Sequence, residues 1–199
     1  MSLVDLVRSD AKILEIAQFL DSLGHEQRVA EAHSLSGADQ KRIFRKAEDS
    51  PPLGLDFFVP AGIPPLTQVV HHGKNSQPAF RFFQKRWCRP ADRDDVLYGY
   101  NETIVRPLIG PGYFVAHETA DGGRDPRGAV VVDYFMVPEG EVAPGWPPVR
   151  PNSQGLQRFV YHQTRDYMRR VSAHVSIGEA HRLEKKVMGW FILSREDRA

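Results

Sequence analysis

The chain has 199 residues, of which 41% are hydrophobic and 26% are charged, and its 26 basic and 25 acidic side chains leave a net charge of +1. This composition is that of an ordinary globular protein, and so balanced a charge provides no long-range attraction to nucleic acid or to an anionic membrane. The single cysteine, Cys88, excludes an intrachain disulfide and a metal site built only from thiolates, and it favours a reducing compartment. The first residues lack the pattern of a signal peptide and charges interrupt every long apolar run, so we expect a cytoplasmic protein without a membrane span.

Residues 1–49 predict a helical lead-in. Ser2, three residues before an acidic side chain, resembles the start of a capped helix whose apolar stripe runs as far as Gly24. A short helix is expected over 25–33, and Ser36 has the same capping pattern at the start of another. The lead-in is therefore a helical hairpin or a set of three helices.

Residues 50–66 form a connector rich in proline and glycine, which break regular elements. Its apolar side chains are too many for a solvated linker, so we expect it to pack along the body. After it, Ser76 and a proline in the next turn predict a helix that ends before Pro90. At helical spacing this segment has an apolar and a basic face: Phe80, Phe83 and Trp87 on the first, and Arg81, Lys85 and Arg89 on the second.

Three strands are expected next, over 96–100, 113–117 and 129–137, because these segments are rich in β-branched and aromatic residues. Turns rich in glycine and proline separate them, which predicts antiparallel neighbours. The loop over 138–155 exceeds the usual length of a connection, and loops of that length are commonly functional or disordered.

The last part of the chain predicts a helix of about four turns over 156–170, followed by closing strands over 174–180 and 187–193. Tight turns between strands favour an antiparallel sheet, and a helix laid across it would supply the second layer. We therefore expect an α+β fold in which N-terminal helices are followed by a curved antiparallel sheet packed on a long helix. A partly closed β-barrel with helical additions is the alternative.

This order of elements predicts a single domain over 1–199. Its parts are the helical lead-in (1–49), the connector (50–66) and an α+β body (67–199). Whether the lead-in docks on the body or on another subunit stays open at this level, and a homo-oligomer is possible.

The strong signatures of nucleotide, metal and hydrolase chemistry are missing from the sequence. It has no G-x-x-x-x-G-K-[ST] or G-x-G-x-x-G loop, no H-E-x-x-H, no C-x-x-C and no G-x-S-x-G. We therefore expect no cofactor.

The eight histidines do not predict a metal site. His71 and His72 are adjacent, so on a strand they point to opposite faces. No pair of histidines has the spacing that places two ligands together on one strand or helix. Histidines at the surface, or held by hydrogen bonds, are the expected outcome.

Asp133 is the most unusual single residue, because it follows three valines in an apolar strand. A buried carboxylate is costly unless paired, and burial raises its pKa, which suits a general base. An acid–base pair with His117 or His174 would then be possible. The alternatives are a solvent-facing side chain or a structural pair with an arginine.

Two further groups could bind a ligand. One face of the helix expected over 156–170 carries Arg158, His162, Arg165 and Arg169. Together with the basic face formed by Arg81, Lys85 and Arg89, it could bind an anion, although solvated helix faces commonly look the same. Trp146, held among prolines in the long loop, could cover a pocket mouth, contact a partner or pin the loop to its own domain.

Three functions are compatible with these observations. The first is a small-molecule-binding protein for an apolar or anionic ligand, with a largely apolar cavity of roughly several hundred Å³. Its aromatic lining would be drawn from Tyr98, Tyr100, Phe114, Phe135 and Trp190. The second is an enzyme independent of metals and nucleotides that uses the Asp/His pair, and the third is a non-catalytic protein–protein interaction module.

Overall fold

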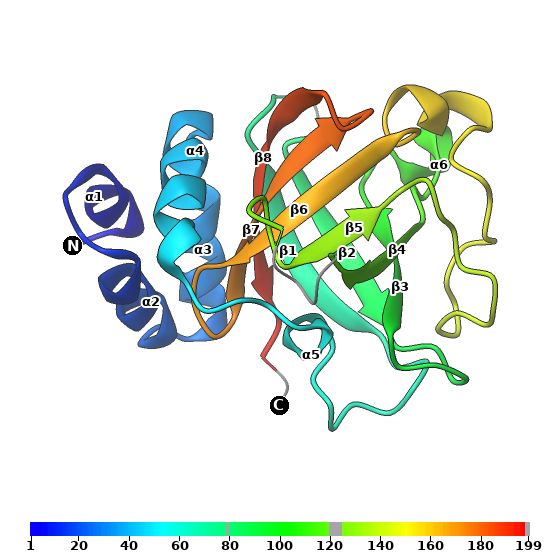
Figure 1. Cartoon of the computed structure of the whole chain (residues 1–199), viewed down its shortest axis with the longest axis horizontal. Coiled ribbons are helices and arrows are strands. Elements are labelled where there is room, and N and C mark those ends of the chain that lie inside the picture. The colour runs from blue at the N-terminus through cyan, green and yellow to red at the C-terminus, as the bar shows by residue number, and fades with distance from the viewer. Residues whose placement is uncertain (79, 120–124, 198–199) are drawn as a thin grey trace.

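The structure is a computed structural model of the chain, and it describes residues 1–78, 80–119 and 125–197. Eight antiparallel strands follow one another around a closed barrel, and the last strand pairs with the first. The N-terminal helices stack against one side of this barrel, and a short helix lies at one of its ends (Figure 1).

The helical elements are α1 (Leu3–Arg8), α2 (Ile13–Asp21), α3 (His25–Ser34), α4 (Gly37–Lys46), α5 (Leu55–Phe58) and α6 (Arg106–Ile109), with 3-10 turns η1 (Ala47–Asp49) and η2 (Gly155–Phe159). The strands are β1 (Val69–Asn75), β2 (Phe82–Cys88), β3 (Val96–Glu102), β4 (Phe114–Glu118), β5 (Val130–Asp133), β6 (Thr164–Arg170), β7 (Val175–Arg182) and β8 (Lys186–Arg195). Within the described part of the chain, no helix is long and apolar enough to cross a membrane.

The barrel corresponds to the alternative fold expected from the sequence, and the curved sheet on a long helix was wrong. The helix expected over 156–170 does not form, because η2 is one short turn and β6 occupies most of the remainder. The helix expected after Ser76 is also wrong, because that segment is strand β2. Strand β1 was not predicted, whereas β3, β4, β5, β7 and β8 were.

The helical lead-in is confirmed, with one more helix than expected. Ser2 and Ser36 both cap helices as predicted, in capping boxes with Asp5 and Asp39. The first expected helix is interrupted after α1 and resumes as α2. The apolar faces of α1 to α4 form one core with the outer face of β7 and β8, where Val175, Ile177 and Ile192 are completely buried, and α3 and α4 contact these strands directly. Burial of this face keeps the lead-in on the barrel.

The connector packs on the body, as predicted, and closes one end of the barrel. Phe58 of α5 lies in the barrel core, where its ring stacks on Trp87 with centroids 4.6 Å apart. The Phe58 carbonyl also lies 3.0 Å from Nε2 of His71 on β1. This end of the barrel is therefore filled by protein side chains.

Large rings fit inside the barrel because they lie over glycines on neighbouring strands. In the strand register Gly73 faces Phe83, Gly99 faces Phe114 and Gly178 faces Phe191. A Cβ atom at any of the three glycines would lie 2.3 to 2.6 Å from the opposing ring. Eight-stranded barrels have an interior only wide enough for side chains or one small ligand, so these pairings decide how much space remains.

Candidate functional site in the barrel cavity

The barrel contains a cavity of about 140 Å³ at the end opposite α5. β1 runs from Val69, beside the α5 plug, to Asn75 at the cavity rim. The described residues that line the cavity come from most strands and from the segments at the open end: Asn75, Ser76, Gln77, Phe80, Phe83, Lys85, Asn101, Thr103, Tyr134, Val160, Tyr161, Thr164, Asp166, Ala180, Met188, Gly189, Trp190 and Phe191. The cavity is thus built from segments spread over most of the body.

The floor of the cavity is a buried polar network centred on Lys85. Its ammonium group donates to Oδ2 of Asp166 at 3.1 Å, to Oδ1 of Asn101 at 3.2 Å and to the hydroxyl of Tyr134. Lys85 is only 1% exposed, and all four residues are buried. Because an ammonium group has three donors, Lys85 is fully satisfied inside the protein.

Burial shifts the pKa values of the ionisable groups in the network in the directions that favour their neutral forms. It lowers the pKa of Lys85 and raises the pKa of Asp166, while the attraction between the two charges opposes both shifts. Burial also raises the pKa of the Tyr134 hydroxyl, and the neighbouring Asp166 charge adds to that effect. Tyr134 therefore keeps its proton and can take part in the network as a neutral hydroxyl.

Aromatic rings form the walls above this floor. The rings of Tyr134 and Phe191, which line the cavity, and of Phe114 in the core below have their centroids 4.9 to 5.0 Å from Nζ of Lys85, within the range of cation–π attraction. Tyr161 stacks on Tyr134 with centroids 5.5 Å apart and lies against Gly112, where a Cβ would come within 2.4 Å of its ring. Gly112 also has a φ of +56°, a conformation that favours glycine.

The rim is held by hydrogen bonds between the β1–β2 turn and β8. Ser76 N–H donates to the Trp190 carbonyl at 2.8 Å, and its hydroxyl accepts from the Trp190 N–H at 2.9 Å. Asn75 donates its amide to the Phe80 carbonyl at 2.6 Å. These contacts fix the opening before any ligand binds, which lowers the entropy cost of binding.

The described lining of the cavity combines apolar walls with a few polar groups. Among the described lining residues, Asp166 is the only carboxylate, and there is no histidine or cysteine. Lys85 would have to leave its partners before its amine could attack a substrate. Apolar walls with a few fixed polar groups are typical of small-molecule sites.

Asp133 and His117, the proposed catalytic pair, lie close together on the outside of the barrel. Asp133 Oδ2 is 3.9 Å from Nε2 of His117 and 2.8 Å from Nε of Arg165, and its Oδ1 accepts from the Phe135 N–H at 2.7 Å. Burial alone would raise the pKa of Asp133, but His117, the Phe135 amide and Arg165 together lower it. The carboxylate therefore stays ionised and pairs with Arg165. A structural pair with an arginine was one of the alternatives that the sequence analysis gave for Asp133.

His174, the other candidate partner, is not part of this group. Its Nδ1 lies 3.2 Å from Oδ1 of Asp197, beyond the end of β8. Burial lowers the pKa of His174, and the nearby Arg28 and Arg195 lower it further. The structure therefore brings together two of the three predicted catalytic residues, and neither of those two lines the cavity.

The predicted aromatic lining is divided between the inside and the outside of the barrel. Phe114 lies inside, and Trp190 contributes to the cavity rim, although its indole donates to Glu179 on the outer face at 2.9 Å. Tyr98 and Tyr100 alternate with the inward residues of β3 and point outward. Phe135 is 46% exposed.

Trp146 pins the long loop to the outer face of the barrel. Its ring packs edge-on against Tyr100, with centroids 5.0 Å apart, and its indole N–H donates to Gln68 at 2.8 Å. Nearby, Ala143 joins a small apolar cluster with Cys88 and Tyr98. The sequence left three roles open for Trp146: covering a pocket mouth, contacting a partner or pinning the loop to its own domain. The observed contacts correspond to the third.

The predicted anion site does not assemble as a helix face. Arg158 belongs to η2, His162 lies in the following turn and Arg165 is on β6. Arg165 is already paired with Asp133 and Glu184. Since the helix expected over 156–170 is absent, the spacing that aligned the three residues no longer applies.

The cavity floor was missed by sequence reasoning. Asn101, Tyr134 and Asp166 had no predicted role in a site. Lys85 was placed on the basic outer face of a helix, as part of a possible anion-binding group. The available signal was a period of two: Phe83, Lys85 and Trp87 alternate with Gln84 and Arg86, as the inward face of a strand requires.

Comparisons of the chain with protein-family models, with curated proteins and with solved structures found no match. The functional inference therefore rests on the cavity itself. A fold alone does not imply a function, so the chemistry of the lining residues carries the conclusion.

Proposed function

We propose that this protein binds one compact, uncharged small molecule in the barrel cavity. The supporting observation is a cavity of about 140 Å³ with aromatic walls above the polar floor of Lys85, Asp166, Tyr134 and Asn101. A closed eight-stranded barrel is compatible with holding one small ligand.

The volume limits the size of the ligand. An apolar protein cavity of about 150 Å³ accommodates benzene. The cavity here is close to that size and smaller than the several hundred Å³ expected from the sequence. The ligand is therefore about one ring, or a short branched chain, rather than a long lipid.

The charges of the floor favour an uncharged ligand that donates a hydrogen bond. Lys85 and Asp166 neutralise each other at 3.1 Å, so the floor has no surplus charge. The donors of Lys85 are occupied, and the amide of Asn101 donates to Gly112 and Tyr134. A carboxylate has about four acceptor positions, so Asp166 can accept from a ligand hydroxyl or amide in addition to Lys85.

The test compares phenol and benzyl alcohol with toluene by calorimetry and ligand-observed NMR. We expect the two donors to bind with a Kd of about 0.1–1 mM, which is reasonable for ligands of this size, and toluene to bind more weakly. Ala180→Leu, which adds a side chain into the cavity wall, should abolish binding. Ala91→Leu, on an exposed turn, is the matched control.

Two results would contradict the proposal. One is binding of phenol that Ala180→Leu leaves unchanged, because the ligand would then sit elsewhere. The other is a folded wild-type protein that binds none of the ring compounds and carries no small molecule in native mass spectrometry after purification.

A further inference from the structure

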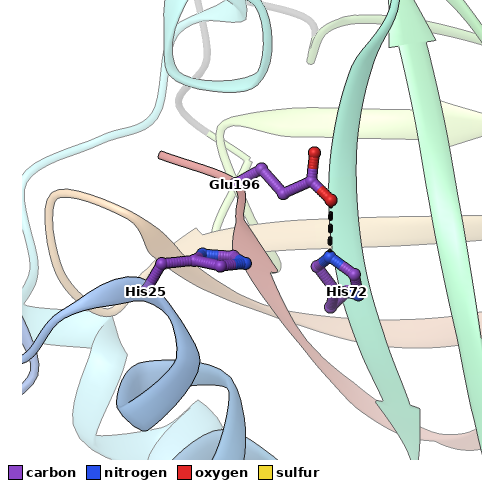
Figure 2. A group of neighbouring side chains, drawn as sticks. All are labelled: His25, His72 and Glu196. Carbon is purple, nitrogen blue, oxygen red and sulfur yellow. Dashed lines mark hydrogen bonds and ion pairs between the residues drawn. The ribbon is translucent and has the colours of Figure 1, made fainter. Parts of the chain in front are cut away.

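Three side chains capable of binding a metal converge where the helices meet the outside of the barrel (Figure 2). His25 is the first residue of α3, His72 lies on β1 and Glu196 follows β8. One possible ligand atom from each lies within 4.8 Å of the other two. Nε2 of His72 is 2.8 Å from Oε1 of Glu196, and the two imidazole rings have centroids 5.4 Å apart.

The backbone around Glu196 is held in place by the barrel and by α3. The Glu196 N–H donates to the Val70 carbonyl at 2.9 Å, which extends the pairing with β1 beyond the end of β8. The next residue, Asp197, accepts from the buried Arg28 of α3 at 2.7 Å. The backbone of Glu196 is therefore fixed on both sides, and the charge of Arg28 is paired with Asp197.

His25 has a ring nitrogen without a protein partner in the described part of the chain, and the Nε2 atom of His72 already faces the Glu196 carboxylate. Nδ1 of His25 is buried and has no hydrogen-bond partner among the described residues. Figure 2 shows the His25 ring extending from α3 toward His72 and Glu196. All three residues are partly exposed, so an ion can reach them from solvent.

We propose that His25, His72 and Glu196 bind one divalent transition-metal ion, with Zn²⁺ as the expected ion. Two imidazole nitrogens and one carboxylate oxygen form a ligand set that zinc uses where a further position is left for water. Imidazole ligands disfavour Ca²⁺ and Mg²⁺, and the lack of sulfur disfavours Cu⁺. Tetrahedral coordination needs ligand atoms about 3.3 Å apart, which small side-chain rotations from the present positions would give.

Metal binding at this place would tie together three parts of the chain that are distant in sequence. His25 belongs to the helical layer, His72 to the first strand and Glu196 to the segment after the last strand. The site lies on the outer face of the barrel, whereas the cavity is inside. It does not depend on the proposed ligand-binding function.

The test is a Zn²⁺ titration of the metal-free protein by calorimetry, with stoichiometry from native mass spectrometry. We expect one Zn²⁺ per chain and a rise in Tm on binding, since a ligand specific for the folded state stabilises it. His25→Asn, His72→Asn and Glu196→Gln should each weaken Zn²⁺ binding by at least about 10-fold. The control is His174→Asn, which removes a neighbouring histidine that pairs with Asp197 instead.

A melting curve of each metal-free variant shows whether it is folded. If Zn²⁺ binds the His25, His72 and Glu196 variants as tightly as the wild type, or if His174→Asn weakens binding equally, the proposed ligand set is wrong. Absence of saturable Zn²⁺ binding to the folded wild-type protein would also overturn it. Binding by these residues should weaken in acid, because protons compete with the metal for imidazole nitrogen.

Discussion

Lys85 places a charged group inside the barrel, and the stability of the fold depends on how that charge is paired. Its charge is buried among aromatic rings and balanced by the single carboxylate of Asp166. A buried ion pair adds little stability by itself, because desolvation offsets the attraction of the charges. Loss of one partner is different, since it leaves the other charge buried without compensation.

Replacing Lys85 by Met should therefore destabilise the protein strongly. We expect Lys85→Met to lower the free energy of unfolding by about 3–5 kcal/mol, measured by urea denaturation. The double variant Lys85→Met with Asp166→Leu should recover most of that loss, because neither charge remains. A cost below about 1 kcal/mol for the single variant would mean that Asp166 is readily protonated or hydrated in the folded state.

At the scale of elements, the contact between α5 and β1 is sensitive to acid. Nε2 of His71 donates to the Phe58 carbonyl at 3.0 Å, while its Nδ1 is buried and has no partner among the described residues. A second proton on the ring would have no acceptor there. Burial accordingly lowers the pKa of His71 from 6.5 to about 3.

This shift predicts the direction of a pH dependence. Between pH 6.5 and about pH 3 the unfolded chain binds a proton at His71 that the folded protein does not, so acid favours unfolding. The stabilisation is fully present above pH 6.5 and is lost progressively as the pH falls toward 3. The slope from one such group reaches at most about 1.4 kcal/mol per pH unit.

The variant His71→Gln keeps a donor for the Phe58 carbonyl and cannot titrate. We expect its free energy of unfolding to fall less steeply than that of the wild type between pH 7 and pH 4, measured by urea denaturation at several pH values. Other groups, including the half-buried His33, contribute to both proteins and cancel in the comparison. Parallel curves for the two proteins would contradict the assignment to His71.

The N-terminal helices and five of the strands could be predicted because their local signals agree with the fold. Ser2 and Ser36 have capping patterns that need no tertiary information, and the residues around Val130 to Tyr134 alternate between the barrel interior and its outer face. The connector was predicted correctly for a physical reason as well. Its phenylalanines would be costly in water, and the structure buries them at the end of the barrel.

Two of the three missed strands, β2 and β6, carry the buried charges of the cavity floor. Lys85 and Asp166 point inward at positions where a strand pattern calls for apolar residues. From the sequence alone, charged side chains were assumed to face solvent. Under that assumption the apolar residues of both segments repeat at helical spacing, which predicted helices instead of strands. The partners that make such charges tolerable lie 81 residues apart, so no local pattern shows them.

At the scale of the whole molecule, the wall formed by β7 and β8 has a core on each side. Phe191 and Leu193 belong to the core inside the barrel, and Ile177 and Ile192 to the core shared with α1 to α4. Hydrogen bonds also join α4 to the barrel. Gln40 donates to the Lys74 carbonyl at 3.2 Å, and Arg169 donates to the Phe44 carbonyl at 2.7 Å. Detachment of the helices would expose one whole face of the wall.

This arrangement predicts that the helices and the barrel unfold in one transition. Each large aliphatic side chain re-exposed on the wall costs about 1.5–3 kcal/mol, so a state with a bare wall is too costly to accumulate. Helical circular dichroism and tryptophan fluorescence should therefore give the same urea midpoint, and Ile177→Ala should shift both by the same amount. Hydrogen exchange should protect the amides of α3 and α4 as strongly as those of β8. Earlier loss of the helical signal, with β8 still protected, would instead define the lead-in as a separate unit and contradict the single domain expected from the sequence.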